Sequence, residues 1–171
     1  MKRTVERGFT LVEIMIVVAI IALLAAIAIP NVLRGRATAN ETAAIGNVRA
    51  LISSLEMYRS VYQAYPTTAA SWDVSMYNPQ PPFGPPSFDN LLMDGGATSL
   101  VQGFQYLFTP VGATPVQSYA VRAVPNTGNS GTRIFFGNDS GQVFHCSGLT
   151  TTTTTPPLGM ATINTVPAAC P

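Results

Sequence analysis

Residues 8–30 have the sequence GFTLVEIMIVVAIIALLAAIAIP, and this stretch decides the fold of the chain. From Phe9 to Ile29 it contains only two polar residues, Thr10 and Glu13. A helix of these 21 residues spans roughly 30 Å, about the hydrocarbon core of one bilayer. The sequence therefore predicts a membrane-spanning helix over residues 9–30.

A short basic segment, residues 1–8, precedes this apolar stretch. It carries Lys2, Arg3 and Arg7 against Glu6, which places the N-terminus in the cytoplasm by the positive-inside rule and sends the rest of the chain across the membrane. A secretory signal peptide is the alternative, because the small residues of AAIA precede Ile29. Its apolar core would span only about 7 to 15 residues and would hold no acid such as Glu13.

Length and composition predict one globular domain in addition to the long helix. The chain has 171 residues, of which 10% are charged and 47% hydrophobic, and its mean hydropathy is +0.27. The net charge of +1 becomes −1 when residues 1–8 are removed. Such a nearly neutral body does not favour nucleic-acid binding.

Beyond Pro30 the apolar residues follow a helical period, so residues 31–64 are predicted to be the amphipathic half of the same helix. Pro30 removes one helical hydrogen bond and Gly35 lowers helix propensity, which predicts a kink there. We expect the helix to end near Tyr62, with Pro66 blocking its extension. The apolar face is predicted to consist of Ile45, Val48, Leu51, Ile52, Leu55, Tyr58 and Tyr62.

Residues 65–101 are rich in proline and glycine and are predicted to form an irregular connection, with at most short helical turns around Asp89 to Met93. We expect Trp72, Phe83 and Phe88 to pack this segment, and Tyr58, Tyr62 and Tyr65 to pack against a sheet.

Residues 102–147 are predicted to form that sheet, with a hairpin turn at NDSG, residues 138–141. Its four strand candidates are residues 103–109, 118–124, 132–137 and 142–146. The predicted class is α+β, with the outer half of the helix packed on an antiparallel sheet of about four strands.

The tail, residues 148–171, holds six consecutive threonines and several prolines, a composition that cannot bury a core by itself. The chain has two cysteines, Cys146 and Cys170, too far apart for a CxxC pair. We interpret them as one disulfide formed in an oxidising compartment, which would fasten the tail. Two free thiols are the alternative.

The N-terminal features together resemble the signature of type IV pilins and of the pseudopilins of type II secretion systems. The resemblance rests on a basic leader ending in Gly8, an aromatic Phe9, the acid Glu13, an unbroken apolar helix and Pro30. It implies a pilin fold, cleavage between Gly8 and Phe9 by a prepilin peptidase, and N-methylation of Phe9. It also implies a homopolymer built by an assembly machinery, in which Glu13 sets the register by pairing with the amine of a neighbouring subunit.

An independent physical argument singles out Glu13. A charged carboxylate near a helix centre in lipid costs about 2.5 to 3.5 kcal/mol, so it is normally retained for a function. The span holds no Lys or Arg, but cleavage after Gly8 would create an ammonium on Phe9. A glutamate that snorkels or stays protonated is the alternative.

The sequence therefore predicts a structural protein with no enzymatic activity and no cofactor: a type IV pilus subunit for adhesion, motility or surface attachment. A secretion pseudopilin is the alternative; the C-terminal cysteine pair resembles the disulfide loop of many type IVa pilins and favours the pilus. A membrane-anchored periplasmic enzyme or binding protein is a third class. His145 is the single histidine, and Asp89, Asp94 and Asp139 lack EF-hand spacing, so no metal is predicted. The expected location is the bacterial inner membrane for the precursor and an extracellular filament afterwards.

Overall fold

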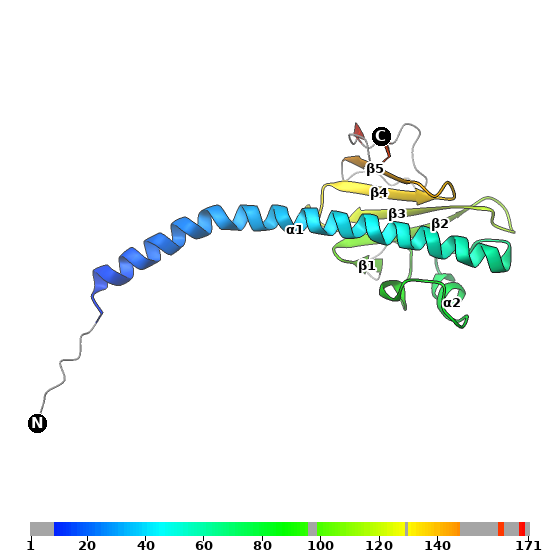
Figure 1. Cartoon of the computed structure of the whole chain (residues 1–171), viewed down its shortest axis with the longest axis horizontal. Helices are drawn as coiled ribbons and strands as arrows, with labels where there is room; N and C mark the ends of the chain where they lie inside the picture. The colour runs from blue at the N-terminus through cyan, green and yellow to red at the C-terminus, as the bar shows by residue number, and fades with distance from the viewer. Residues whose placement is uncertain (1–8, 96–98, 129, 148–160, 163–167, 170–171) are drawn as a thin grey trace, which may run out of the picture. The chain divides into compact units, whose positions relative to one another are not determined.

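The computed structural model describes residues 9–95, 99–128, 130–147, 161–162 and 168–169. The chain divides into two compact units, Met1–Gly35 and Arg36–Pro171, which are described separately. Helix α1 (Leu11–Tyr62) contributes to both units (Figure 1). The Gly8 side of the predicted cleavage site lies outside the described residues.

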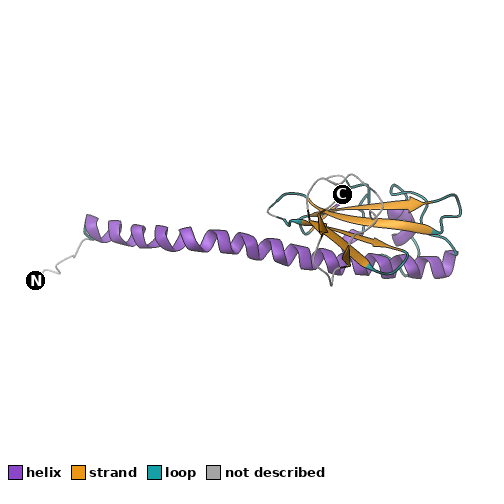
Figure 2. Cartoon of the chain, turned by 90° about the horizontal axis from the view of Figure 1, so that it is seen from above, coloured by secondary structure: helices purple, strands orange, loops and turns teal. Residues whose placement is uncertain are grey.

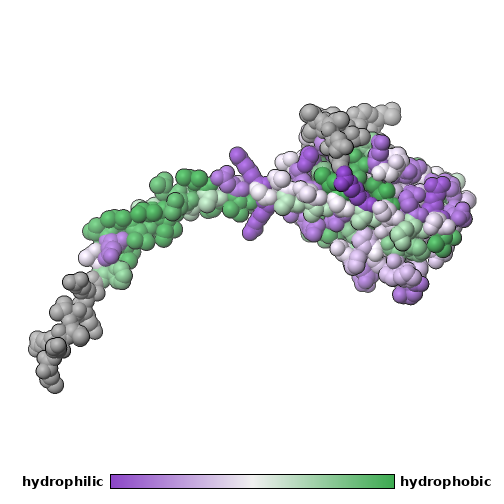
Figure 3. Space-filling model, viewed as in Figure 1, coloured by the Kyte–Doolittle hydropathy of each residue, from purple (hydrophilic) through white to green (hydrophobic). Residues whose placement is uncertain are grey.

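The first unit contains the apolar part of α1. Its side chains from Phe9 to Leu33 are exposed, apart from the half-buried Ala25, and Figure 3 shows them as an almost continuous hydrophobic surface on the face in view. Within the described residues, α1 is the one helix long and apolar enough to cross a membrane. The helix continues through Pro30. Beside it, the side-chain Nδ2 of Asn31 donates a hydrogen bond to the backbone carbonyl of Ile27 at 3.1 Å. The predicted kink at Pro30 stays a prediction.

The second unit contains the amphipathic part of α1, which lies along one face of a sheet (Figure 2). The helix ends at Tyr62, where Gln63 has a left-handed φ of 56° and its N–H donates to the Arg59 carbonyl. Tyr62 was predicted to pack against the sheet but is half exposed; it lies in the last turn of α1, with its ring tilted against Tyr58 at 4.5 Å between centroids. Helical spacing recurs among the buried residues Glu41, Ala44, Val48, Leu51, Ile52, Ser54 and Leu55.

The connection after α1 contains helix α2 (Trp72–Tyr77) and the 3₁₀ turn η1 (Pro86–Phe88). The prediction of helical turns around Asp89 to Met93 was wrong. Asp89 is extended with ψ of 138°, Asn90 has a positive φ of 59°, and Met93 accepts a hydrogen bond from the β2 residue Phe108. The predicted aromatic packing is confirmed for Trp72 and Phe88, which are fully buried, while Phe83 is half buried.

The sheet is a meander in the order β1-β2-β3-β4-β5-β6, with β7 also pairing with β5. All pairs are antiparallel except β5 with β7. The four predicted strands are confirmed as β2 to β5, and the NDSG turn joins β4 to β5, with Gly141 at φ 74°. The sequence reasoning missed β1, β6 and β7, which have two residues each. The strands are β1 (Leu100–Val101), β2 (Phe104–Val111), β3 (Ser118–Pro125), β4 (Arg133–Asn138), β5 (Val143–Ser147), β6 (Ala161–Thr162) and β7 (Ala168–Ala169).

Short pieces of chain cover both outer edges of the long strands. On the outer edge of β2, β1 pairs at one end, and farther along Gly95 donates to Tyr106 at 2.9 Å while Phe108 donates to Met93 at 2.8 Å. On β5, β6 pairs with Phe144 and His145, and β7 with Cys146 and Ser147. Backbone groups that would otherwise lie open at these edges therefore have partners within the chain.

The C-terminal cysteine prediction is only half within the described residues. Cys146 is fully buried on β5, whereas Cys170 and most of the tail lie outside them. The pairing of β7 with β5 brings Ala168 opposite Cys146, two positions before Cys170 in the sequence. The Cys146–Cys170 bond stays a prediction.

Both faces of β4 are buried. Phe135 belongs to the core between sheet and helix, while Ile134 and Phe136, on the opposite face, form a second cluster with Cys146. Gly137 permits the close approach of α1: a Cβ there would lie 2.7 Å from Ile52 Cδ1 and 2.9 Å from Val48 Cγ1. The close packing of α1 on β4 at this point therefore depends on a residue without a side chain.

Replacing Gly137 with alanine should destabilise the second unit by about 1–3 kcal/mol, since the added methyl overpacks a filled core. Trp72, the single tryptophan, is fully buried and reports unfolding of this unit by fluorescence. Chemical denaturation of the full chain in detergent micelles would measure the loss. Gly128→Ala is the matched control, because a Cβ there meets nothing within 4 Å. Equal stability of the two variants would contradict the close packing.

Candidate assembly site

The N-terminus of α1 is capped by Thr10. The Glu13 N–H donates to Thr10 Oγ1 at 3.2 Å, and the Ile14 N–H donates to the Thr10 carbonyl at 3.3 Å. Thr10 and Glu13 have the spacing of a capping box, which favours helix initiation at this point. The sequence reasoning missed this cap, although a threonine three residues before a glutamate is its usual signal.

Glu13 lies exposed in the first turn of α1, where the free N–H groups and the helix dipole favour a carboxylate. Phe9, one turn earlier in the sequence, is 80% exposed. Between Phe9 and Leu33 the chain contains no Lys or Arg. If residues 1–8, with Lys2, Arg3 and Arg7, are removed at the predicted cleavage site, a cation for Glu13 has to come from the new N-terminal amine or from another molecule.

Removing the cap should loosen the first turn that carries Glu13. Thr10→Ala is expected to cost about 1 kcal/mol of local helix stability, since the Glu13 N–H loses its acceptor. Amide hydrogen exchange of Val12 and Glu13 in micelles would then speed up about fivefold. Thr10→Ser keeps the hydroxyl and should exchange as the wild type does; equal rates for the alanine variant would show that the cap contributes nothing.

A buried ion pair fastens α1 to the sheet. Glu41 Oε2 lies 2.8 Å from both Nε and the terminal NH2 nitrogen of Arg133, and Glu41 Oε1 accepts from the Thr132 N–H at 2.7 Å and from the Thr132 hydroxyl at 3.1 Å. Burial by itself raises the pKa of Glu41, but the hydrogen bonds from Thr132 and Arg133 outweigh it and hold the pKa below its usual value. Glu41 is therefore ionised and fully engaged at neutral pH.

Sequence reasoning missed this pair because the partners lie 91 and 92 residues apart. One signal was present: Glu41 occurs three and seven residues before Ala44 and Val48, on the apolar face of the helix. A carboxylate on such a face requires a partner when the face is buried.

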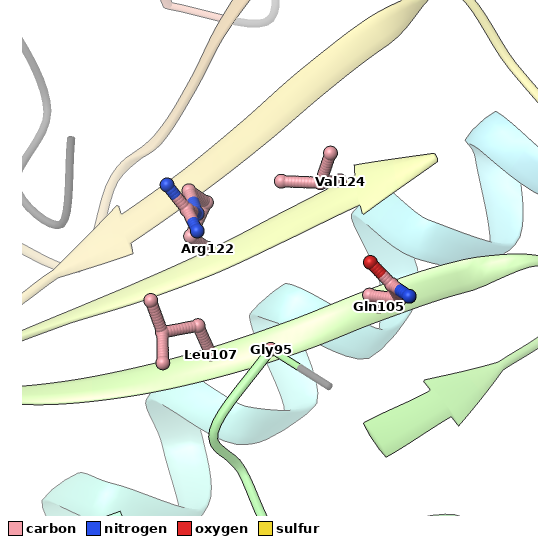
Figure 4. Close-up of a pocket in the computed structure, with 5 residues that line it drawn as sticks. All are labelled: Gly95, Gln105, Leu107, Arg122 and Val124. Carbon is pink, nitrogen blue, oxygen red and sulfur yellow. The ribbon is translucent and has the colours of Figure 1, made fainter. Parts of the chain in front are cut away.

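Two hollows in the second unit lack the groups of a catalytic site. The smaller, about 70 Å³, lies on the sheet face away from α1 and is lined by Gly95, Gln105, Leu107, Arg122 and Val124 (Figure 4); burial lowers the pKa of Arg122. The larger, about 440 Å³, is an apolar groove at the end of α1. Neither lining includes a His, Cys, Asp, Glu, Ser or Lys that could act as nucleophile or base.

The candidate metal ligands do not come together. His145 is buried with its ring stacked on Phe135 at 6.4 Å between centroids, and Asp139 lies in the β4–β5 turn. Among the residues with described positions, no group of three His, Cys, Asp or Glu side chains could hold a metal ion. The feature that distinguishes this chain is therefore the exposed apolar part of α1, with the carboxylate of Glu13 in its first turn.

Comparison with known proteins finds likeness along the chain. Residues 3–29 match the prokaryotic N-terminal methylation motif. The chain is 33% identical over 143 residues to type II secretion system core protein G of Pseudomonas aeruginosa, covering 81% of this chain and 98% of that protein. It is 34% identical to the core protein G of Dickeya chrysanthemi, over 71% of this chain and 82% of that protein. A type IV wide pilus major component of Thermus thermophilus is 42% identical over 38% of this chain and 50% of that protein. No solved structure matches the chain significantly.

Proposed function

Since the chain belongs to the family of pilin-type proteins that includes type II secretion core protein G and type IV pilins, we propose that it is the structural subunit of a type IV pilus. It is made as a pilin-type precursor anchored in the inner membrane by its apolar helix. A prepilin peptidase cuts it between Gly8 and Phe9 and methylates the new amine, and the assembly machinery adds the subunit to an extracellular filament.

One observation carries this proposal: the apolar part of α1 is exposed along its whole length and has a single charge, Glu13, in its first turn. Lipid covers this surface in the precursor, and neighbouring helices cover it in a filament. Each square ångström of apolar surface kept from water contributes about 25 cal/mol, less the cost of ordering the subunits. The second unit, fastened to the same helix by Glu41 and Arg133, then forms the outer layer.

Glu13 supplies the register of this helix packing. Its carboxylate pairs with the Phe9 amine of a neighbouring subunit, an attraction of roughly 4 kcal/mol at 4 Å and an effective dielectric of 20 before desolvation is subtracted. An apolar stripe alone would allow helices to slide past one another. A pair that forms only at one stagger excludes the other alignments.

The pseudopilus of a type II secretion system is the second candidate. It is favoured by the match to the Pseudomonas core protein G, which extends over 98% of that protein. The pilus is favoured by the two cysteines of the sequence, Cys146 and Cys170, which we propose form the C-terminal disulfide loop found in many type IVa pilins. Such a bond would close a loop of about 25 residues and stabilise the second unit by roughly 3–4 kcal/mol.

Shearing the cells separates the two candidates. The released filaments are collected, and the intact mass of their main protein is measured before and after reduction. A bulk species that begins at methylated Phe9 and gains two hydrogens on reduction is the expected result. If the trimmed chain stays in the inner membrane, the pseudopilus becomes the better assignment; an untrimmed N-terminus would exclude both.

A further inference from the structure

The apolar groove at the C-terminal end of α1 has a volume of about 440 Å³ and opens to solvent. One wall is formed by Met57, Val61 and Tyr62, which are 55%, 60% and 50% exposed. The other wall is formed by residues 79–83, Pro-Gln-Pro-Pro-Phe. This is the kind of surface that a soluble protein covers with a partner.

The groove is held open by its own wall contacts. Phe83 packs edge-on against Tyr58 and Tyr62, at 5.5 and 6.0 Å between ring centroids. The Phe83 N–H donates to the Met76 carbonyl at 2.8 Å, and the Tyr77 hydroxyl donates to the Pro85 carbonyl at 2.7 Å. A partner therefore meets a preformed surface and does not have to order it.

The segment that forms the second wall of the groove is acidic in sequence. No Lys or Arg occurs between Arg59 and Arg122, while the segment that forms the second wall carries Asp73 and Asp89 at its two ends. Asp73 accepts a hydrogen bond from the Asn90 N–H at 2.8 Å, which fixes the two ends together. Asp89 is exposed. A matching surface should be apolar and end in a cation.

Helix α1 of the same chain carries such a surface. Ile29, Val32, Leu33 and Arg36 recur at the spacing of one helix face, and all four are exposed. No acid occurs between Glu13 and Glu41, so this stretch of helix has only positive charge. The face is an apolar stripe with a cation at its C-terminal end.

We propose that the groove is a docking site for a second copy of this chain, which inserts the stripe of Ile29, Val32 and Leu33 and places Arg36 against Asp89. The inference rests on the proposed filament and specifies a contact within it. The two surfaces differ, so the contact is head-to-tail, and in the proposed filament it continues from copy to copy as an open strand instead of closing into a ring. Arg36 and Val61 lie 25 residues apart on α1, so each such contact advances the strand of subunits by about 37 Å.

A charge exchange tests the proposed pair. Arg36→Asp and Asp89→Arg each place like charges together, which should lower the yield of sheared filaments by about tenfold or more. The double variant carries the reversed pair and should recover most of the wild-type yield. Arg49→Asp is the matched control, an exposed arginine on another face of the same helix, and should assemble normally. Trimmed subunit in the membrane, measured for every variant, should be unchanged.

A second pair of variants tests the groove itself. Val61→Ser and Val74→Ser remove equal side chains that are 60% and 59% exposed, but only Val61 lines the groove. We expect the filament yield to fall severalfold for Val61→Ser alone. Normal filaments from every variant, or no recovery in the double charge variant, would overturn the docking site and leave the proposed function standing. If Val61→Ser blocks assembly without charge recovery, the groove is needed for assembly but does not receive the stripe that ends in Arg36, and the proposed contact is refuted. A wild type that never forms filaments would instead refute the function and this contact with it.

Discussion

Glu13→Ala should abolish filaments while leaving membrane insertion and cleavage after Gly8 intact. The variant loses the carboxylate that, in the proposed filament, pairs with the Phe9 amine of a neighbouring subunit. If desolvation cancels half of the roughly 4 kcal/mol attraction, about 2 kcal/mol remains, which lowers the association constant about thirtyfold for each subunit added. Insertion should improve, because a charge has been removed from an apolar span. Sheared filament and trimmed membrane protein, quantified in the same cells, measure the two effects.

Two further substitutions separate charge from shape at this position. Glu13→Gln keeps the size of the side chain and should fail as alanine does. Glu13→Asp keeps the charge on a shorter arm and should retain part of the yield. The hydrogen bond from the backbone N–H of residue 13 to Thr10 Oγ1 remains possible in all three, because it does not use the side chain of residue 13. Wild-type filament yield from both Glu13→Ala and Glu13→Gln would refute the register role.

The Glu41 substitution should have the largest effect on the stability of the second unit. Glu41→Ala leaves Arg133 without its carboxylate and the Thr132 N–H without its acceptor. Breaking one side of a buried pair typically costs 3–5 kcal/mol, and we expect about 3 because Arg133 is partly exposed. The melting temperature should fall by about 10 °C. Trp72 fluorescence of the full chain in micelles would measure it.

The same pair predicts how stability depends on pH. Because the pKa of Glu41 is below its usual value of 4.5, its contribution is fully present above about pH 5 and is lost as the pH falls through the lowered value. The wild type should therefore lose more stability than Glu41→Gln between pH 6 and about pH 3. Asp139→Asn is the control, because Asp139 is an exposed acid in the β4–β5 turn, outside this pair. Parallel pH curves for the wild type and Glu41→Gln would contradict the ion pair.

The sequence could predict the helix and the main strands because their signals are local. The apolar run from Phe9 and the spacing of Val48, Leu51 and Leu55 predict one long helix, and the NDSG turn pairs β4 with β5. The short strands β1, β6 and β7 could not be predicted, since two residues carry no period and their pairing is decided by neighbours in space. The short helices were misplaced because α2 depends on Trp72 packing at 5.3 Å from Phe108, a contact across 36 residues.

The residues of the candidate site likewise fall into those with a local sequence signal and those without one. Phe9, Glu13 and the apolar helix could be found from composition and order alone. The Glu41–Arg133 pair and the groove beside Val61 could not, because each is formed by segments that are separate in the sequence and meet only in the folded chain. Such contacts depend on geometry that no local pattern encodes.

The covered edges of the sheet matter most when many subunits are packed side by side. An unpaired edge strand as long as β2 can pair with a strand of another molecule and start cross-β aggregation. This risk increases with the local protein concentration, which is very high inside a polymer. Here β1, Met93 and Gly95 occupy the hydrogen bonds of β2, and β6 and β7 occupy those of β5. In the proposed filament, these partners leave fewer open backbone groups for strand pairing between the second units of neighbouring subunits.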